Sequence, residues 1–561
     1  MQSWCAVIPL LAGLVTASGL VPRAGNGTII TTSGPVMGRV VNNVNEFLGI
    51  PYAQAPTGSL RFEPPQRFNG TALINATNFG FTCPQPAGSA PGAGTAGAPP
   101  PNFAAAGITP AGLALFGVAL SNTAPQGEDC LSLNIWVPNG GAASKPVTIF
   151  VHGGGLTTGS SNVPMYNGNI FAGEQDVIVV NLNYRLGIFG FPSNPSVPQK
   201  NLGLLDQRMA VEWVRDNIAA FGGDNKRIVL AGQSAGSASL DLYSYAYASD
   251  PIVQGFIMQS GTQNLANGGG AALPNGPPPS SPATNTSAGW FNASAALGCG
   301  GSTSNPATVL TCMQSKNVTD IVTATTTIGF QPAADNISVF TDYPALTATG
   351  KFSKVPILIG SNDHETGLFE SLSKLMATNT TASLPPSFWV GVDNSVFVCP
   401  SSARANVSVQ QGVTTFRYRY FGVFPDTAFS ATSGAWHSSE ILQLSGVVPA
   451  ANAMGVPAVT QQELAIQKYM RGAWAAFIKD PKQGLVTYGW PAYQPTLPTV
   501  VRLGINNATG PNVASAAMFD GVCNNTVAVS PTSAASGNGL SHGLTVLLVW
   551  TLSMALLITQ Y

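Results

Sequence analysis

Residues 227–236 read Arg-Ile-Val-Leu-Ala-Gly-Gln-Ser-Ala-Gly, an apolar run that leads into a Gly-x-Ser-x-Gly pentapeptide centred on Ser234. The run predicts a buried strand, and the residues after the pentapeptide predict a helix. A serine on a tight turn between a strand and a helix needs small neighbours, because a Cβ at Gly232 or Gly236 would collide with one of the two elements. The pattern therefore predicts an α/β fold in which the Ser234 hydroxyl projects from the carboxyl edge of a sheet.

A run of glycines follows a second predicted strand, Val147–Val151. The residues are His152-Gly153-Gly154-Gly155, and consecutive glycines leave backbone N–H groups free to meet a negatively charged oxygen. Acyl transfer needs such donors, because its tetrahedral intermediate carries a full charge on the former carbonyl oxygen, and losing one donor costs about a hundred- to a thousand-fold in rate. We therefore expect an oxyanion-binding turn here, although the same glycines alone would indicate only a flexible loop.

The chain contains only four histidines, so few residues can act as the general base. His437 lies in the Gly/Ser-rich segment 433–440 after a late strand, which is where serine hydrolases place their base. The other three belong to different features: His152 to the glycine turn, His364 to the acidic segment described next, and His542 to the C-terminal tail. We expect His437 to be the base rather than a structural histidine.

The candidate acids follow the predicted strand Val355–Ile359. Asp363 and Glu365 both lie in the segment 360–367, and either could fix the tautomer of the imidazole and stabilise the imidazolium. The chain order of serine, acid and histidine is that of an α/β-hydrolase.

Continuous apolar runs predict the buried parallel strands of such a fold. They lie near 147–151, 177–181, 228–231 and 355–359. Helices are expected over 204–221 and 234–248, and a capping box at Thr460–Glu463 opens a late helix that runs to about Lys479.

Further segments resemble the type-B carboxylesterase family, which includes carboxylesterases, cholinesterases and fungal lipases. The matching segments are Phe47–Ala53, Leu60–Phe62, Glu128–Trp136, Asn183–Gly187, Asn201–Arg208, Phe221–Asp224 and Gln259–Gly261. The resemblance covers roughly residues 25–525 and implies an α/β-hydrolase fold, with a central, mostly parallel sheet flanked by helices. It implies no cofactor, and the sequence has no Cys-x-x-Cys or His-Glu-x-x-His run of the kind that binds a metal.

The resemblance also assigns roles to individual residues. Ser234 is the nucleophile, Glu365 the acid and His437 the base, and the N–H groups of Gly154, Gly155 and Ala235 form the oxyanion hole. It implies two buried ion pairs, Arg61–Glu128 and Arg185–Asp206.

Two features depart from the family pattern. Gln233 stands where the family most often has glutamate, so the imidazolium should be less stabilised. The segment 84–127 holds only Phe103 and Phe116 as aromatic residues, and it lacks the tryptophan on which cholinesterases stack a quaternary ammonium. A choline ester is therefore disfavoured as substrate.

Composition argues against nucleic acid as a partner, because a net charge of −1 means that the chain has no excess of Lys and Arg to bind phosphates. The 561 residues are 45% hydrophobic, enough for a large core, but only 8% are charged, against roughly 25% in average chains. Something else must keep the surface soluble, and Asn-x-Ser/Thr sequons spread along the chain suit a secreted glycoprotein. They are Asn26, Asn69, Asn75, Asn285, Asn292, Asn317, Asn336, Asn379, Asn406, Asn507 and Asn524.

Both ends of the chain indicate export. Residues 1–17 contain an apolar run followed by small residues, which predicts a signal peptide, although its first residues lack a positive charge. Residues 531–561 join a small, polar stretch to an uncharged apolar tail with no Lys or Arg behind it. This pattern favours a GPI-attachment signal over a spanning helix. The catalytic domain would then occupy 18–530, and only the C-terminal anchor would contact a membrane.

The chain has seven cysteines, of which Cys5 falls in the predicted signal peptide. Six then remain in an oxidising compartment, and spacing alone allows fifteen connectivities. Cys299 and Cys312 bracket a small loop, the resemblance implies a Cys83–Cys130 pair, and Cys399 and Cys523 are left for each other.

The segment 83–130 is rich in Ala, Gly and Pro and carries an apolar patch at 108–120. Resemblance to fungal lipases implies a lid with an apolar inner face that opens at a lipid surface. The alternative is a low-complexity loop that only extends the surface, which is also what we expect of residues 268–287.

These features predict a secreted or cell-surface carboxylic ester hydrolase that acts on a small-molecule or lipid ester through an acyl-enzyme. An alternative is a lipase for long-chain or sterol esters, which the apolar lid favours slightly. A further alternative, outside the enzymes, is a non-catalytic adhesion module of the same fold. The intact set of Ser234, Glu365 and His437 argues against it, because a binding module needs none of them.

Overall fold

The structure is a computed structural model, and it describes residues 28–86, 103–104, 106–116, 124–141, 144–266, 287–376, 384–448 and 455–526. The predicted signal peptide at 1–17, the C-terminal segment 531–561 and nearly all of the 268–287 insertion lie outside the described residues. So do three of the sequons, Asn26, Asn285 and Asn379.

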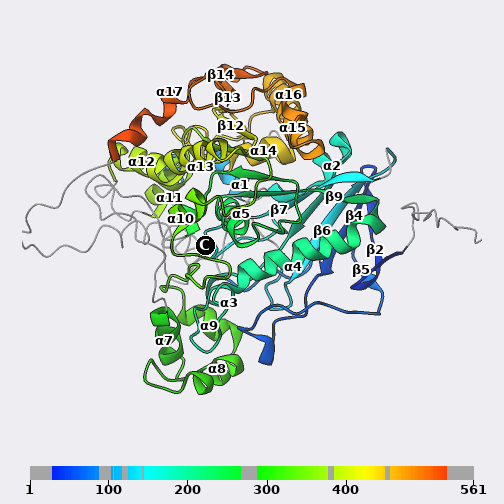
Figure 1. Ribbon diagram of the computed structural model, residues 1–561, viewed down its shortest axis with the longest axis vertical. Coiled ribbons are helices and arrows are strands. Elements are labelled where there is room, and N and C mark those ends of the chain that lie inside the picture. Colours follow the sequence, from blue (N-terminus) through cyan, green and yellow to red (C-terminus); the bar gives the residue numbers. More distant parts are fainter. Residues whose placement is uncertain are drawn as a thin grey trace, which may run out of the picture.

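An 11-stranded sheet runs through the molecule in the order β14-β13-β12-β11-β10-β9-β7-β8-β6-β4-β3 (Figure 1). The strands are β3 (Arg39–Val41), β4 (Val44–Pro51), β6 (Ser132–Pro138), β7 (Lys145–Val151), β8 (Ile178–Leu182), β9 (Gly223–Gln233), β10 (Gly255–Gln259), β11 (Ile357–Asn362), β12 (Thr415–Tyr420), β13 (Val500–Leu503) and β14 (Asn512–Ala514). Neighbours from β8 through β13 are parallel, and the pairs at both edges are antiparallel. The mostly parallel sheet expected from the sequence is confirmed.

The central strands are buried on both faces, which explains their continuous apolar runs. Every residue of β8, β10 and β11 is buried. Side chains alternate along β9, so that Ile228 and Leu230 enter one half of the core and Val229 and Ala231 enter the other.

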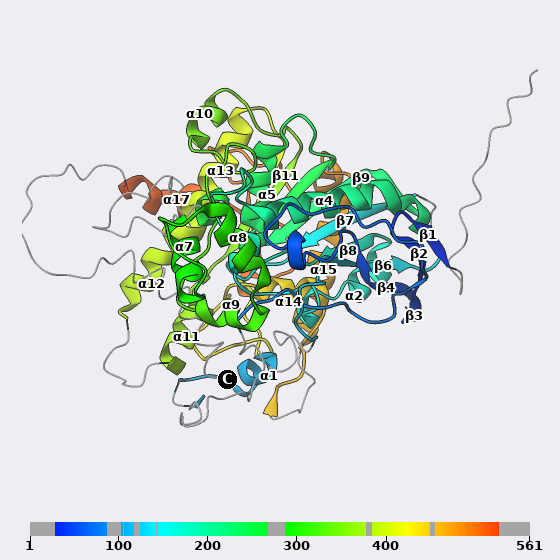
Figure 2. The ribbon, with the colours of Figure 1, turned by 90° about the horizontal axis from the view of Figure 1, so that it is seen from below.

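Helices cover each face of the sheet (Figure 2). On the Ile228 face lie α4 (Leu202–Asn217) and α5 (Ala235–Ala246). On the Val229 face lie α2 (Asn169–Gln175), α14 (Ser439–Ser445) and α15 (Gln461–Lys479). The Thr460 hydroxyl accepts the Glu463 N–H at 3.1 Å, so the helix start predicted there is confirmed. The helix predicted to reach Phe221 instead ends in a 3₁₀ turn, Ile218–Phe221, before Gly222 with φ +85°.

Smaller elements surround this core. A separate sheet is formed by β1 (Ile29–Thr31), β2 (Gly34–Met37) and β5 (Ile74–Asn75). Helices α7 (Ser287–Ala296), α8 (Pro306–Ser315) and α9 (Val318–Ala324) gather at one end of the molecule, at the bottom of Figure 1. The remaining helices are α1 (Pro110–Leu115), α3 (Gly187–Gly190), α6 (Gln263–Ala266), α10 (Tyr343–Ala348), α11 (Gly367–Met376), α12 (Pro386–Val392), α13 (Cys399–Gln410), α16 (Gly484–Tyr488) and α17 (Ala517–Asp520).

The cross-links expected from the sequence are present. The disulfides are Cys83–Cys130, Cys299–Cys312 and Cys399–Cys523. Arg185 makes a two-pronged pair with Asp206 at 2.7 and 2.8 Å, and Arg61 holds Glu128 in the same way. Breaking such a buried pair by removing one partner costs about 3–5 kcal/mol, because it strands the other charge. In the described part of the chain, no helix has both the length and the hydropathy needed to cross a bilayer.

Candidate active site

Ser234 occupies the turn between β9 and α5 with a strained backbone, φ 57° and ψ −124°. Its glycine neighbours are required by space: a Cβ at Gly236 would lie 2.1 Å from the Val151 carbonyl oxygen, and one at Gly232 would lie 2.7 Å from the backbone of Gly236. Strain of this kind costs about 1–3 kcal/mol and persists where the surrounding structure enforces it. The turn predicted from the pentapeptide is therefore present, and Ser234 as a whole residue is 3% exposed.

The glycine turn after β7 lies directly against Ser234, since a Cβ at Gly153 would come within 2.9 Å of the serine Cβ. Gly154 and Gly155 have φ of +107° and +63°, and a Cβ at Gly154 would lie 2.2 Å from the Thr158 carbonyl oxygen. Within the described residues, no acceptor receives the N–H of Gly154, Gly155 or Ala235. Free donors beside a serine are what a developing oxyanion needs.

His152 shapes this turn rather than serving as a base. Its Nδ1 lies 2.8 Å from the Gly153 carbonyl oxygen, and its ring stacks on Tyr184 with centroids 4.5 Å apart. Burial lowers the pKa of His152 to about 4, so the ring is neutral at physiological pH. A neutral ring donates from Nδ1 and stiffens the glycine turn.

Of the two candidate acids, Glu365 is the one that lies against His437. Its Oε2 lies 2.7 Å from His437 Nδ1, and its Oε1 accepts the backbone N–H of Asn362 at 2.7 Å. Asp363, two residues away, is exposed and pairs instead with Arg419 at 3.0 Å. Backbone hydrogen bonds from His437 to Glu365 and from His364 to Ala435 join the acid segment to the histidine loop.

His437 is 4% exposed and lies between the rings of Phe369 and Phe397, with centroids 5.4 and 5.0 Å away. Its second nitrogen, Nε2, lies 3.1 Å from Nε2 of Gln233, the residue before Ser234. The base and the nucleophile's turn therefore meet, although they are far apart in the sequence. Sequence reasoning noted Gln233 for its missing charge but did not predict this contact.

A buried carboxyl group behind the acid was missed by sequence reasoning. Glu440, fully buried at the start of α14, accepts hydrogen bonds from Gln259 at 3.1 Å and from the Asn362 side chain at 2.6 Å. Burial, and then the negative charge of Glu365, raise the pKa of Glu440 to about 7. The available signal was a glutamate three residues after the candidate base in a chain with few charges.

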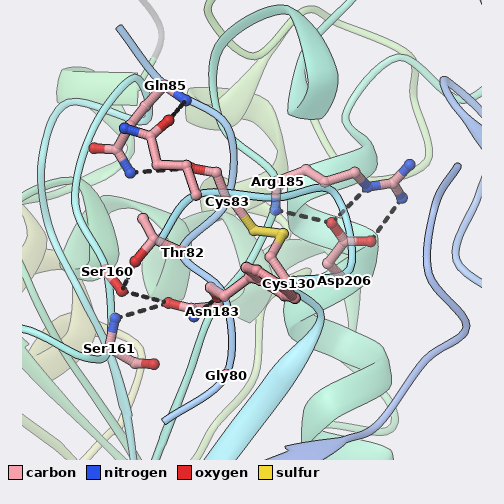
Figure 3. Close-up of a disulfide and its surroundings, with 12 residues drawn as sticks. Gly80, Thr82, Cys83, Gln85, Cys130, Ser160, Ser161, Asn183, Arg185 and Asp206 are labelled. Carbon is pink, nitrogen blue, oxygen red and sulfur yellow. Dashed lines mark hydrogen bonds and ion pairs between the residues drawn. A yellow bond between two sulfur atoms is a disulfide. The ribbon is translucent and has the colours of Figure 1, made fainter. Parts of the chain in front are cut away.

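The N-terminal end of the 83–130 segment is hydrogen-bonded to the loop that follows the glycine turn (Figure 3). Beside the Cys83–Cys130 disulfide, Thr82 donates to Ser160 at 3.2 Å and Ser160 donates to Asn183 at 3.1 Å. Gln85 exchanges two hydrogen bonds with the backbone of Gly159, each 2.9 Å long. One end of the predicted lid and the loop after the oxyanion turn are therefore held by the same network of hydrogen bonds.

The described inner part of this segment packs toward the histidine loop. Thr109 caps α1 and donates its backbone N–H to Phe429, and the Phe116 ring lies 4.9 Å from the Phe429 ring. Phe429 in turn lies 5.8 Å from Trp436, the neighbour of His437. The described part of the apolar patch, residues 108–116, thus packs next to the loop of the candidate base. Residues 87–102, 105 and 117–123 of the segment are outside the described residues.

No group of three or more His, Cys, Asp or Glu side chains that could hold a metal ion occurs in the ranges given above for the described chain. The candidate site brings together a serine, an imidazole, a carboxylate and backbone amides.

Known proteins resemble this chain in sequence and in fold. A model of the carboxylesterase family matches residues 26–383. The chain is 32% identical to a chlorogenic acid esterase of Aspergillus niger over 87% of this chain and 94% of that protein, and 31% identical to secreted lipase 5 of Gibberella zeae over 85% and 90%. Its fold matches a PNB esterase with a TM-score of 0.64 and 25% identity, over 85% of this chain and 96% of that one.

Proposed function

Since this chain belongs to the carboxylesterase family and is a carboxylic ester hydrolase, we propose that it works through an acyl-enzyme formed on Ser234. His437 is the general base and Glu365 the carboxylate that orients it. Gly154, Gly155 and Ala235 supply the oxyanion N–H donors. The observation that carries the proposal is the position of the His437 ring, with Nδ1 2.7 Å from a fully buried carboxylate and Nε2 at the turn of Ser234.

The reaction proceeds in two halves. His437 takes the proton of the Ser234 hydroxyl as the oxygen attacks the ester carbonyl, and the backbone amides stabilise the oxyanion. The alcohol then leaves with the proton held by His437, and water, activated by the same ring, releases the acid. Glu365 accepts the Nδ1–H of His437, which fixes the tautomer that presents Nε2 as the proton acceptor.

Esters with a bulky apolar part are the preferred substrates in this proposal. The rings of Phe369 and Phe397 flank the base, and Phe116 and Phe429 bring the lid segment close to it. A chlorogenic acid esterase and a secreted lipase are among the relatives, which supports this preference. A lid at 83–130 that moves at a lipid surface would favour the long-chain class.

We also propose that the protein is secreted, glycosylated and held at the cell surface by a GPI anchor, after removal of residues 1–17. Three disulfides support an oxidising compartment. Most sequon asparagines whose side chains are described are exposed: Asn69, Asn75, Asn292, Asn317, Asn336 and Asn507. Asn406 is half-buried and accepts a hydrogen bond from Tyr493.

Hydrolysis of p-nitrophenyl esters of graded acyl length tests the catalytic proposal. We expect the wild type to hydrolyse at least one ester and Ser234→Ala to lose about five to six orders of magnitude in kcat. Equal activity in the two proteins would remove Ser234 from the mechanism. A rate that rises with acyl length supports the lipase alternative, and one that peaks at short acyl chains rejects it.

A further inference from the structure

A cavity of about 80 Å³ lies on the Val229 face of the sheet, apart from Ser234. Its floor is formed by β7, β9 and β10, through residues that include Thr148, Ala231 and Ile257. Its roof is formed by α14 and α15, through Ile441, Leu444 and Trp474. A water molecule needs about 10–15 Å³ on a comparable measure, so this space holds more than one.

One polar atom in this apolar lining is unsatisfied. The Thr148 hydroxyl is buried, and no hydrogen-bond partner for it occurs among the described residues. A buried hydroxyl without a partner costs about 1–3 kcal/mol, so a native structure normally supplies one. Other polar side chains in the lining have partners: Gln259 donates to Glu440 and accepts from Trp474, Asn167 accepts the N–H of Asn169, and Ser445 accepts the N–H of Val447.

Water alone fits this space poorly. A buried water is held by two to four polar partners, and the Thr148 hydroxyl is the one side-chain atom of this lining that is buried without a partner among the described residues. A molecule that is apolar over most of its surface and has a single hydroxyl would satisfy Thr148 and fill the rest by dispersion contacts. An engineered cavity of about 150 Å³ in another protein admits benzene, so about half that volume limits the occupant to a few heavy atoms.

We propose that this cavity is a binding site for a short-chain aliphatic alcohol, with its hydroxyl on Thr148 and its alkyl part between Ala231, Ile257 and Trp474. The location gives the site a direct contact with the catalytic region. Helix α14 begins two residues after His437, and Gln259 in the cavity wall holds Glu440. The inference does not depend on the catalytic roles proposed above, because binding is measured without turnover.

Xenon and 2-propanol are the probes that test it, one purely apolar and one with a hydroxyl. In crystals of the wild type we expect xenon density in the cavity, and 2-propanol density with its oxygen within hydrogen-bond distance of Thr148 Oγ1. Thr148→Val keeps the shape of the side chain and removes only the hydroxyl. In solution, NMR titration of this variant should show 2-propanol affinity lowered about fivefold, the equivalent of one hydrogen bond, with xenon affinity within about twofold.

A filling variant serves as the matched control. Ala231→Ile places three further carbons in the cavity and should abolish binding of both probes, and Ala231→Val replaces it if that variant does not fold. Water as the sole occupant of the cavity under both probes would overturn the proposal. So would unchanged 2-propanol affinity in Thr148→Val or in the filled variant.

Discussion

The turn that carries Ser234 and the loop that carries His437 are two halves of one site, but they are held in different ways. Backbone geometry holds the first, because any side chain at Gly232, Gly236, Gly153 or Gly154 would collide with a neighbouring backbone. In the second, side chains place the imidazole, namely Glu365, Gln233 and two phenylalanine rings from distant segments, and two backbone hydrogen bonds join the loop to the acid segment. A local backbone constraint requires particular residues close together and is visible as a sequence motif. Contacts between distant segments leave no such motif.

The largest effect expected on the side-chain half comes from Glu365→Gln. An amide in place of the carboxylate no longer fixes the tautomer of the imidazole or stabilises the imidazolium, so kcat should fall about ten-thousand-fold. Steady-state kinetics on the best p-nitrophenyl ester measures it. Asp363→Asn, two residues away in an exposed pair with Arg419, is the matched control and should stay within about twofold. A larger loss in Asp363→Asn than in Glu365→Gln would reverse the assignment of the acid.

On the backbone half, Gly154→Ala should cost about a hundred- to a thousand-fold in kcat. Its Cβ would lie 2.2 Å from the Thr158 carbonyl oxygen, so the turn must shift and its N–H donors leave their positions. Gly140→Ala is the control, because Gly140 also has a positive φ but open space around it. The melting temperature of both variants reports the shared backbone strain. Wild-type kcat in a folded Gly154→Ala protein would show that the turn does not bind the oxyanion.

Glu440→Gln tests the buried carboxyl group near Glu365. The measured quantity is the free energy of unfolding rather than the catalytic rate. Burial and Glu365 raise the pKa of Glu440 to about 7, against about 4.3 in an unfolded chain. The folded protein therefore keeps this proton at pH values where the unfolded chain has lost it, so the free energy of unfolding decreases as the pH rises from about 4 through 7.

Between pH 5 and pH 8, the free energy of unfolding of the wild type should fall by about 2 kcal/mol more than that of Glu440→Gln. Urea denaturation with the disulfides intact measures the difference. Glu370→Gln, a carboxylate nearer the surface that pairs with Lys374, is the control and should follow the wild-type slope. Parallel curves for Glu440→Gln and the wild type would mean that Glu440 is already ionised in the folded protein at pH 5.

The same contrast explains which features of the fold and the site could be predicted from the sequence. The buried strands, the capped start of α15 and the turn at Ser234 each depend on residues that are close in sequence, and each was predicted. The choice between Asp363 and Glu365 needed the family resemblance, because residues alone do not tell which carboxylate turns toward His437. The role of Glu440 and the contact between Gln233 and His437 were missed, because both arise where segments distant in the sequence pack together.

The smallest effect is expected from Gln233→Glu. This residue connects the two parts of the site, because it belongs to the turn of Ser234 and contacts the base His437. The Gln233 amide lies 3.1 Å from His437 Nε2 and is neutral. A carboxylate in its place would favour the imidazolium over the neutral ring that must accept the serine proton. We expect the acid limb of the kcat/KM profile to move to higher pH by about one unit, with kcat on the plateau within about threefold. Gln233→Met, uncharged and of similar length, should leave the limb in place. An unmoved limb in Gln233→Glu would mean that residue 233 does not face the base during turnover, and the two halves would then meet only through Ser234.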